Sequence, residues 1–187
     1  MQEDLKRAVE ILKAGGVILY PTDTIWGIGC DATNEEAVKR VYKIKNREDS
    51  KSMLVLMENP ALLDRYVDYV PEVAWELVEI STTPLTVIYP NAKNLAKNLV
   101  AEDGSIGIRF TREAFTYQLL QRFRRPLVST SANISGEKSP AFFSEISEEI
   151  KNQVDYIVRY RQDDNTPAQP SSIIKLGPGG RIDIIRK

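Results

Sequence analysis

Short apolar runs alternate with amphipathic stretches along most of the chain, and this alternation limits the folds it can adopt. The runs are rich in Val, Ile, Leu and Tyr, which indicates buried strands. Strands that alternate with helices and end in a hairpin favour an α/β protein with a mixed sheet. We expect a single domain over residues 1–187, because no repeat or linker interrupts the pattern. The expected strands cover residues 16–20, 52–57, 85–90, 106–110, 126–130 and 154–159, and residues 171–176 and 181–186 form the hairpin.

Helix signals fall between these runs. Leu5 and Leu12 lie on one face of an amphipathic helix that ends before Gly15. Thr33 and Glu36 match a capping box ahead of a second helix, which we expect to reach about residue 44. Further helices are expected after Pro60, from Pro71 to Ile80, over residues 112–123 and within residues 144–153, and residues 91–105 read as loop or irregular helix.

The composition excludes several kinds of chemistry. The chain contains no histidine, which excludes a Ser-His-Asp triad, a histidine general base and most catalytic zinc sites. Its single cysteine, Cys30, excludes an internal disulfide. The net charge of −1 gives no overall sign of a polyanion partner. Since no apolar run reaches about 18 residues and the N-terminus lacks a signal-peptide core, we expect a cytoplasmic protein without a membrane span.

Three small polar residues follow the first expected strand. Thr22, Asp23 and Thr24 come directly after Pro21, in the stretch "LYPTDTIWGIGC". Ligands of open α/β sheets usually sit at strand ends, so these side chains could form the floor of a pocket. A plain turn, in which the same side chains satisfy backbone groups, explains them equally simply.

A local excess of positive charge lies between Lys39 and Lys51. This stretch contains six basic residues and two acidic ones. Lys45, Arg47 and Lys51 surround a predicted helix end, where they could converge on one anion. Favourable placement of cations at a helix C-terminus is the alternative, and it explains Arg47 and Lys51 less well because they lie beyond the helix.

Hydroxyl groups dominate the loop "STSANISGEKSP", residues 129–140, which follows an apolar strand. Such a loop can surround phosphate oxygens with neutral donors, although it could equally be a polar surface loop. Without histidine, a serine nucleophile would need a Ser-Lys pair. Arg109 within a strand needs a partner, because an unpaired buried guanidinium is costly. The chain contains neither of the common glycine-rich nucleotide-binding motifs.

Taken in order, these stretches resemble the YrdC/TsaC family of threonylcarbamoyl-AMP synthases. The similarity runs from "YPTDTIWGIG" through "STSANISG" to "PSSI". Lys45-Asn46-Arg47 resembles the K-x-R signature of the family, and Ser131-Ala132-Asn133 resembles its S-x-N signature. The resemblance implies a twisted mixed sheet flanked by helices around a concave cavity, without the extra C-terminal domain of longer members.

The resemblance also implies an activity. L-threonine, bicarbonate and ATP would give threonylcarbamoyl-adenylate and pyrophosphate, for threonylcarbamoylation of tRNA by downstream transfer proteins. Direct contact with tRNA is possible. Mg²⁺ would be carried by the ATP phosphates with few protein ligands, so no metal ligand is assigned.

Site residues follow from the matched positions. Those expected to support catalysis are Lys45, Arg47, Ser131 and Asn133. Those expected to contact threonine are Thr24, Arg109, Ser129 and Ser171. Those expected to contact the nucleotide are Arg47, Lys51, Ser105, Ser131, Ser139 and Arg186.

The chain departs from the family pattern at several positions near the expected threonine site. Trp26 stands where the family usually has tyrosine, and Thr83 stands at a glycine position. Phe110 and Thr111 follow Arg109 in place of x-Pro. Leu56 occupies a position that can be histidine in relatives and can touch threonine.

Two other functions remain open from the residues alone. One is a non-catalytic RNA-binding module that uses the basic stretch from Lys39 to Lys51, which would show salt-dependent RNA affinity without ATP consumption. The other is an amidohydrolase with Ser131 in a Ser-Lys pair.

Overall fold

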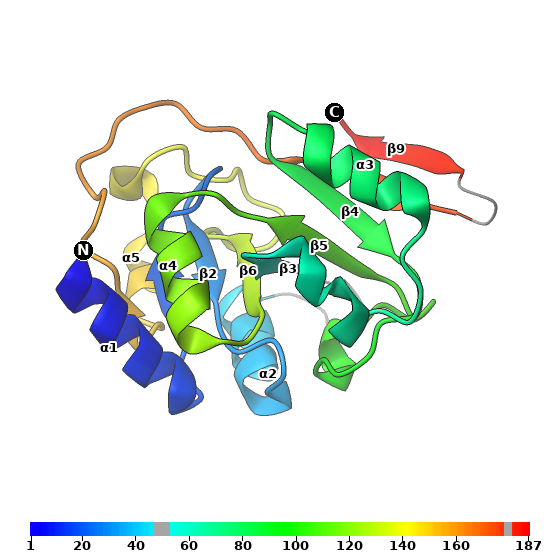
Figure 1. The fold of residues 1–187 in the computed structure, drawn as a ribbon. Helices are drawn as coiled ribbons and strands as arrows, with labels where there is room; N and C mark the ends of the chain where they lie inside the picture. The colour runs from blue at the N-terminus through cyan, green and yellow to red at the C-terminus, as the bar shows by residue number, and fades with distance from the viewer. Residues whose placement is uncertain (47–52, 178–180) are drawn as a thin grey trace.

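Nine strands form one mixed sheet in the part of the chain that the structure describes (Figure 1). The structure is a computed structural model and describes residues 1–46, 53–177 and 181–187. The strand order is β7-β1-β2-β6-β3-β5-β4-β8-β9, which confirms the α/β class with a mixed sheet. The strands are β1 (Ile18–Tyr20), β2 (Gly27–Gly29), β3 (Leu54–Met57), β4 (Leu85–Tyr89), β5 (Ile106–Phe110), β6 (Leu127–Ser131), β7 (Tyr156–Ile157), β8 (Ser172–Leu176) and β9 (Ile182–Arg186).

Helices connect most of these strands and cover the sheet. α1 and α4 lie side by side and share a small core with Leu5, Phe115 and Leu119 (Figure 1). The α-helices are α1 (Gln2–Lys13), α2 (Glu35–Ile44), α3 (Glu72–Ile80), α4 (Ala114–Phe123) and α5 (Glu148–Lys151), and the 3₁₀ helices are η1 (Pro60–Arg65), η2 (Lys97–Leu99) and η3 (Phe143–Glu145). None of the helices in the described ranges is long and apolar enough to cross a membrane.

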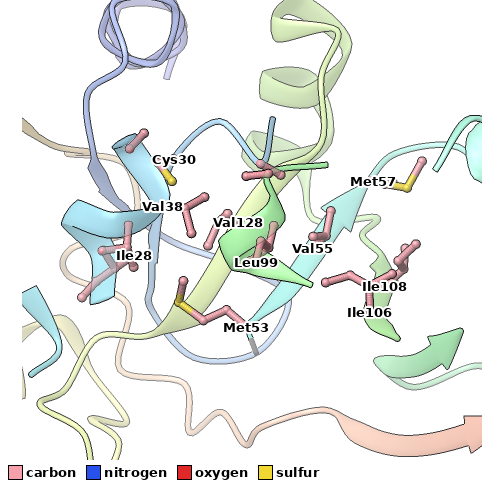
Figure 2. Packing of buried hydrophobic residues seen from close by; sticks show 14 of the residues in the cluster. Ile28, Cys30, Val38, Met53, Val55, Met57, Leu99, Ile106, Ile108 and Val128 are labelled. Carbon is pink, nitrogen blue, oxygen red and sulfur yellow. The ribbon is translucent and has the colours of Figure 1, made fainter. Parts of the chain in front are cut away.

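The pleat of the sheet separates two faces with different roles. On β5, Ile106 and Ile108 enter the larger hydrophobic core with Val55 and Val128, as Figure 2 shows. Because successive side chains of a strand point to opposite faces, the Arg109 side chain projects from the other face, and Gly107 is oriented toward that face as well. That other face carries the small core under α1 and α4 at one end and leaves the rest of the sheet free for a site.

Strand β2 was not predicted, because two of its three residues are glycine. A Cβ at Gly29 would lie 2.3 Å from the carbonyl oxygen of Val128 and 2.7 Å from the ring of Tyr20. The absence of a side chain lets the Tyr20 ring pass and lets its hydroxyl donate to the Val128 carbonyl at 3.2 Å. Close approach of two strands thus accounts for a glycine that reads as a turn signal in the sequence.

The expected start of α2 was wrong by one residue. Asn34 is the N-cap, and its side chain accepts a hydrogen bond from the amide of Ala37. The Thr33 hydroxyl instead donates to Asp31 at 2.7 Å, within a turn that precedes the helix. Both residues are good caps, so the sequence alone does not decide between them.

The C-terminal hairpin was predicted correctly, and its antiparallel strands contain an irregularity. Ile173 pairs with Arg186, whereas the next residue, Ile174, pairs with Ile184. Two residues of β9 therefore oppose a single step of β8, which is a β-bulge at Ile185. The segment after β7 crosses from one edge of the sheet toward the other before it enters β8 (Figure 1).

Candidate active site

A cavity of about 760 Å³ lies on the face of the sheet opposite the larger core. This volume is within the range of about 300–1,000 Å³ that is usual for small-molecule sites. Alternate residues of β4, β5 and β8 line it, as the pleat requires, and the end of β6 adds the consecutive residues Ser129, Thr130 and Ser131. The predicted site residues in its wall are Thr24, Ser105, Arg109, Ser129, Ser131, Ser139, Ser171 and Arg186.

The turn after β1 is both a hydrogen-bonded turn and part of the cavity wall. The Thr22 hydroxyl donates to the carbonyl of Ile25 at 2.8 Å and accepts from the amide of Thr24. Its single proton is used by Ile25, so the 3.0 Å contact between the two threonine hydroxyls has Thr24 as the donor. The Thr24 oxygen, which lines the cavity, therefore has lone pairs left to accept a hydrogen bond from a ligand N–H.

Arg109 is the most deeply buried cation of the cavity wall. Its side chain is 3% exposed, and its Nη2 atom lies 3.1 Å from Oδ1 of Asp23. Burial raises the pKa of the Asp23 carboxyl, and the nearby Arg109 charge lowers it in part. The Nε atom of Arg109 has no hydrogen-bond partner among the described residues. One donor of this guanidinium is therefore unused among the described residues, and the residue lines the cavity.

Lys45 and Asn133 lie behind the cavity wall. The Lys45 ammonium donates to the carbonyl oxygens of Ser131 and Asn133 at 2.5 and 2.7 Å. The Asn133 amide donates to the carbonyl oxygens of Ile134 and Glu137. Neither side chain lines the cavity, although we expected both to support catalysis. Their contacts stabilise the conformation of the loop that follows β6.

The β-bulge explains why an edge strand contributes a cation to the cavity. Ile185 and Arg186 both line it, although consecutive residues of a regular strand face opposite sides. The Arg186 Nε atom donates to the carbonyl oxygen of Ser171 at 2.9 Å. Partial burial and the nearby Arg109 charge lower the pKa of Arg186. Two cations thus converge on the same space without a carboxylate between them.

Ser105 belongs to a cluster that the sequence did not reveal. Its hydroxyl donates to Asp103 at 2.5 Å, and the Lys175 ammonium lies 2.6 Å from the same carboxylate. Hydrogen bonds from Lys175 and Ser105 lower the pKa of Asp103 to about 2. Because the Ser105 hydroxyl donates its hydrogen bond to Asp103, its oxygen presents lone pairs to the nucleotide that we expect it to contact. One sequence signal could have revealed this cluster: the alternation of side chains along β8 places Lys175 on the face of the strand that lines the cavity.

The positions that depart from the family pattern lie in three different places. Trp26 lines the cavity and packs against Phe143, with ring centroids 4.9 Å apart. Leu56 is fully buried in the small core and does not line the cavity. Thr83 and Phe110 line a second cavity of about 480 Å³.

Two central predictions cannot be placed. Arg47 and Lys51 lie outside the described residues. Within the described ranges, no group of three or more Asp, Glu or Cys side chains could hold a metal ion. Asp103 and Glu102 are the carboxylate residues in the described wall of the cavity.

The wall combines cations with neutral hydroxyls, which is the chemistry of anion binding. Arg109 and Arg186 contribute donors from two strands, and Ser129, Ser131 and Ser171 add hydroxyl groups. The fold and the cavity thus define a class: α/β proteins with an anion-binding cavity on one face of a mixed sheet. The chain belongs to the Sua5/YciO/YrdC family, because the family model described as "Telomere recombination" matches residues 10–187.

Curated relatives are similar over most of their length. The chain is 36% identical to a threonylcarbamoyl-AMP synthase of Pseudoalteromonas translucida over 175 residues, which are 92% of each protein. It is 34% identical to a putative threonylcarbamoyl-AMP synthase of Methanocaldococcus jannaschii, over 94% of this chain and 83% of the relative.

Solved structures have the same fold. E. coli YciO superposes with a TM-score of 0.86 and 26% identity, over 100% of this chain and 90% of YciO. P. abyssi Sua5 complexed with L-threonine superposes with a TM-score of 0.82 and 23% identity, which supports the fold alone. This chain covers 92% of its own length in that match and only half of the Sua5 chain.

Proposed function

We propose that this chain forms threonylcarbamoyl-adenylate and pyrophosphate from L-threonine, bicarbonate and ATP. One observation carries the proposal. Side chains from distant parts of the sequence, Thr24, Arg109 and Arg186 among them, gather in one cavity with a row of serine hydroxyls. That cavity suits a triphosphate beside a small amino acid, and curated relatives that match most of this chain are named for this activity.

The threonine end of the cavity lies at Arg109 and Thr24. The Arg109 guanidinium, which lines the cavity, would bind the substrate carboxylate, since a guanidinium matches a carboxylate with two parallel hydrogen bonds. The Thr24 oxygen, whose proton is directed to Thr22, would accept from the substrate amine. Ser129 and Ser171 complete this end, and the Ser171 hydroxyl is already held by Thr86 at 2.8 Å.

The nucleotide end includes Arg186 and the loop after β6. Arg186 would contribute charge, while Ser131 and Ser139 would donate to phosphate oxygens. Arg47 and Lys51 are proposed to bind the phosphates from the segment between α2 and β3. Lys45 is proposed to act on this end indirectly, because it fixes the carbonyl groups of the loop that carries Ser131.

The reaction needs positioning and charge stabilisation more than a protein nucleophile. The threonine amine attacks the carbon of bicarbonate, which loses water and leaves a carbamate. A carbamate oxygen then attacks the α-phosphorus of ATP and expels pyrophosphate. Cations aligned with the phosphates stabilise the developing negative charge. This scheme suits a chain without histidine.

The magnesium ion is proposed to enter with ATP. Mg²⁺ prefers oxygen ligands and retains several waters, so phosphate oxygens with one or two carboxylates suffice. Glu102 and Asp103 are the carboxylate residues of the described wall, and both Asp103 oxygens already contact Ser105 or Lys175. The donor set of the described residues therefore fits an ion held mainly by its substrate.

The two alternatives are less well supported. A Ser-Lys hydrolase needs a neutral lysine beside the serine hydroxyl, whereas the Lys45 ammonium donates to two carbonyl oxygens. An RNA-binding module would use the basic stretch from Lys39. Within that stretch Arg40 is paired with Asp155 at 2.7 Å, and Lys45 is buried. Contact with tRNA and with downstream transfer proteins remains part of the proposal.

The purified protein tests this function directly. With ATP, L-threonine and bicarbonate, we expect release of pyrophosphate and a new AMP-linked product that mass spectrometry identifies. Omission of either threonine or bicarbonate should abolish both signals. Pyrophosphate release that is independent of threonine would contradict the proposal, as would salt-sensitive RNA binding in a protein that never consumes ATP.

A further inference from the structure

The ion pair between Asp23 and Arg109 lies between the two cavities of the protein. Arg109 is part of the wall of the 760 Å³ cavity, whereas Asp23 is part of the wall of the second, 480 Å³ cavity. Thr24, the next residue, faces the first cavity. The short turn after β1 thus contributes to both cavities, with Asp23 in the wall of the second and Thr24 in the wall of the first.

Asp23 is the counter-ion of Arg109, a buried cation with few other polar partners among the described residues. Across residues 1–46, 53–177 and 181–187, it is the only carboxylate within ion-pair distance of Arg109. Arg109 is 3% exposed, and its Nε atom has no hydrogen-bond partner within these ranges. A buried guanidinium without a counter-charge is strongly unfavourable, so it would turn toward water or toward another acceptor.

The position of Asp23 is itself fixed by the turn. The Thr22 hydroxyl accepts from the Thr24 amide and donates to the Ile25 carbonyl, on either side of Asp23. Arg186 adds a second cation close enough to Arg109 for each charge to affect the other. Without the negative charge of Asp23, repulsion from Arg186 would also favour a different orientation of the Arg109 side chain.

We propose that Asp23 is a positioning residue that orients the Arg109 guanidinium toward the substrate carboxylate. This inference rests on the proposed function and on the role of Arg109 within it. Asp23 contacts Arg109 from the second cavity, whereas Arg109 itself lines the first cavity, where the substrate carboxylate would bind. The opposite role, in which Asp23 competes with the substrate carboxylate for Arg109, predicts an effect of the opposite sign.

The test is the isosteric variant Asp23→Asn, assayed for both substrates. We expect the KM for L-threonine to rise about tenfold or more, the size of one lost charge-assisted interaction, while the KM for ATP changes less than about threefold. The preference of the enzyme for L-threonine over L-threoninamide, which lacks the carboxylate charge, should fall in parallel. Glu79→Gln is the matched control, because Glu79 lines the same second cavity and has no ion-pair partner within the described ranges.

Several results would overturn the inference. A KM for L-threonine that equals that of the control, or falls below it, excludes positioning, and a fall indicates competition. An unchanged preference over L-threoninamide excludes it as well. If the wild-type protein forms no AMP-linked product, the proposed function itself has failed; an active wild type with an unaffected Asp23→Asn variant removes only the positioning role.

A double variant keeps the inference testable if Asp23→Asn is too unstable to assay. Asp23→Asn combined with Arg109→Gln leaves no unpaired buried charge, so we expect its melting temperature to recover toward the wild-type value. In that background, the Asp23→Asn change should have no further effect on L-threonine affinity. A double variant as unstable as Asp23→Asn alone would show that Asp23 stabilises the turn and does not act by orienting Arg109.

Discussion

The Lys45 ammonium lies behind strand β6, 2.5 Å from the carbonyl oxygen of Ser131, a residue that lines the cavity. A second carbonyl, that of Asn133, accepts from the same ammonium at 2.7 Å. One buried cation thus fixes the backbone on both sides of Ala132. This lysine holds the loop from behind the cavity wall, whereas the sequence predicted only that it supports catalysis.

Loss of Lys45 should therefore affect the fold as well as the activity. We expect Lys45→Met to lower the free energy of unfolding by about 2–3 kcal/mol, because two buried carbonyl groups lose their donor. Urea denaturation measures this change. Lys39→Met, an exposed position on the same helix, is the control and should change stability by less than about 0.5 kcal/mol. Equal effects of the two variants would contradict the supporting role.

Arg186 should affect nucleotide binding and leave stability nearly unchanged. We expect Arg186→Gln to raise the KM for ATP about tenfold to a hundredfold, because a charge-assisted contact to phosphate is lost. The change in unfolding free energy should stay below about 1 kcal/mol, since β9 is an edge strand. Arg181→Gln, which precedes β9 and removes an exposed pair with Asp183, is the matched control. A KM for ATP that matches the control's would remove Arg186 from the site.

Gly29 should tolerate no side chain. A Cβ there would lie 2.3 Å from the Val128 carbonyl oxygen, so Gly29→Ala must push β2 away from β6 or displace Tyr20. We expect a loss of about 3 kcal/mol or more, measured by thermal or urea unfolding. Gly177→Ala should cost far less, because its nearest neighbour is the flexible Arg181 side chain at 3.3 Å. A stable Gly29→Ala protein would show that the strand spacing here is wrong.

The Asp155 carboxylate should make stability depend on acid pH. Hydrogen bonds from Arg40 and from the Val17 amide lower its pKa below 3.8, despite some opposing desolvation. The ionised form therefore stabilises the folded state above about pH 3.8, and this contribution is lost as the pH falls through the lower pKa of the folded protein.

The variant Asp155→Asn measures this pH-dependent contribution to the free energy of unfolding. The difference in unfolding free energy between wild type and Asp155→Asn should be largest near pH 7 and should shrink as the pH falls below about 3.8. Asp163→Asn, on an exposed side chain without an ion pair among the described residues, should show no such trend. A difference that grows on acidification would reverse the assigned direction.

Arg47 gives a prediction that comes from the sequence alone. If it binds phosphate with two charge-assisted hydrogen bonds, Arg47→Ala loses roughly 3–5 kcal/mol of transition-state stabilisation, which is about 10² to 10⁴ in rate. The protein should remain folded by circular dichroism. Lys43→Ala, a change to a neighbouring cation in the last turn of α2, is the control. Near-wild-type turnover in Arg47→Ala would refute the assigned role.

The alternation of apolar runs and helical stretches was sufficient to predict the α/β class and most elements. It failed at β2, because glycine reads as a turn unless the neighbouring strand is known. It also placed the cap of α2 on Thr33, because the adjacent Asn34 is an equally good cap and the pattern does not decide between them. Local signals report propensity, whereas the pairing of β2 depends on contacts between distant parts of the chain.

The candidate site was predicted in its components but not in its geometry. Arg109 and Ser131 share one cavity, as a common ligand requires. The counter-ion Asp23, the Asp103–Lys175 pair and the position of Lys45 behind the loop depend on pairings between distant strands. The bulge that directs Arg186 into the cavity has no sequence signature, because it arises from the register of β9 on β8.

The position of β8 beside β4 has a consequence for biosynthesis. These strands pair in parallel although the partners Thr86 and Ile173 lie 87 positions apart in the sequence, and β9 can add only after β8 is in place. While the ribosome is still elongating the chain, the helices and the first strands can already pack, but the pocket lacks one side. Ligand-dependent protection of a nascent chain should therefore begin only once residue 186 has emerged from the exit tunnel.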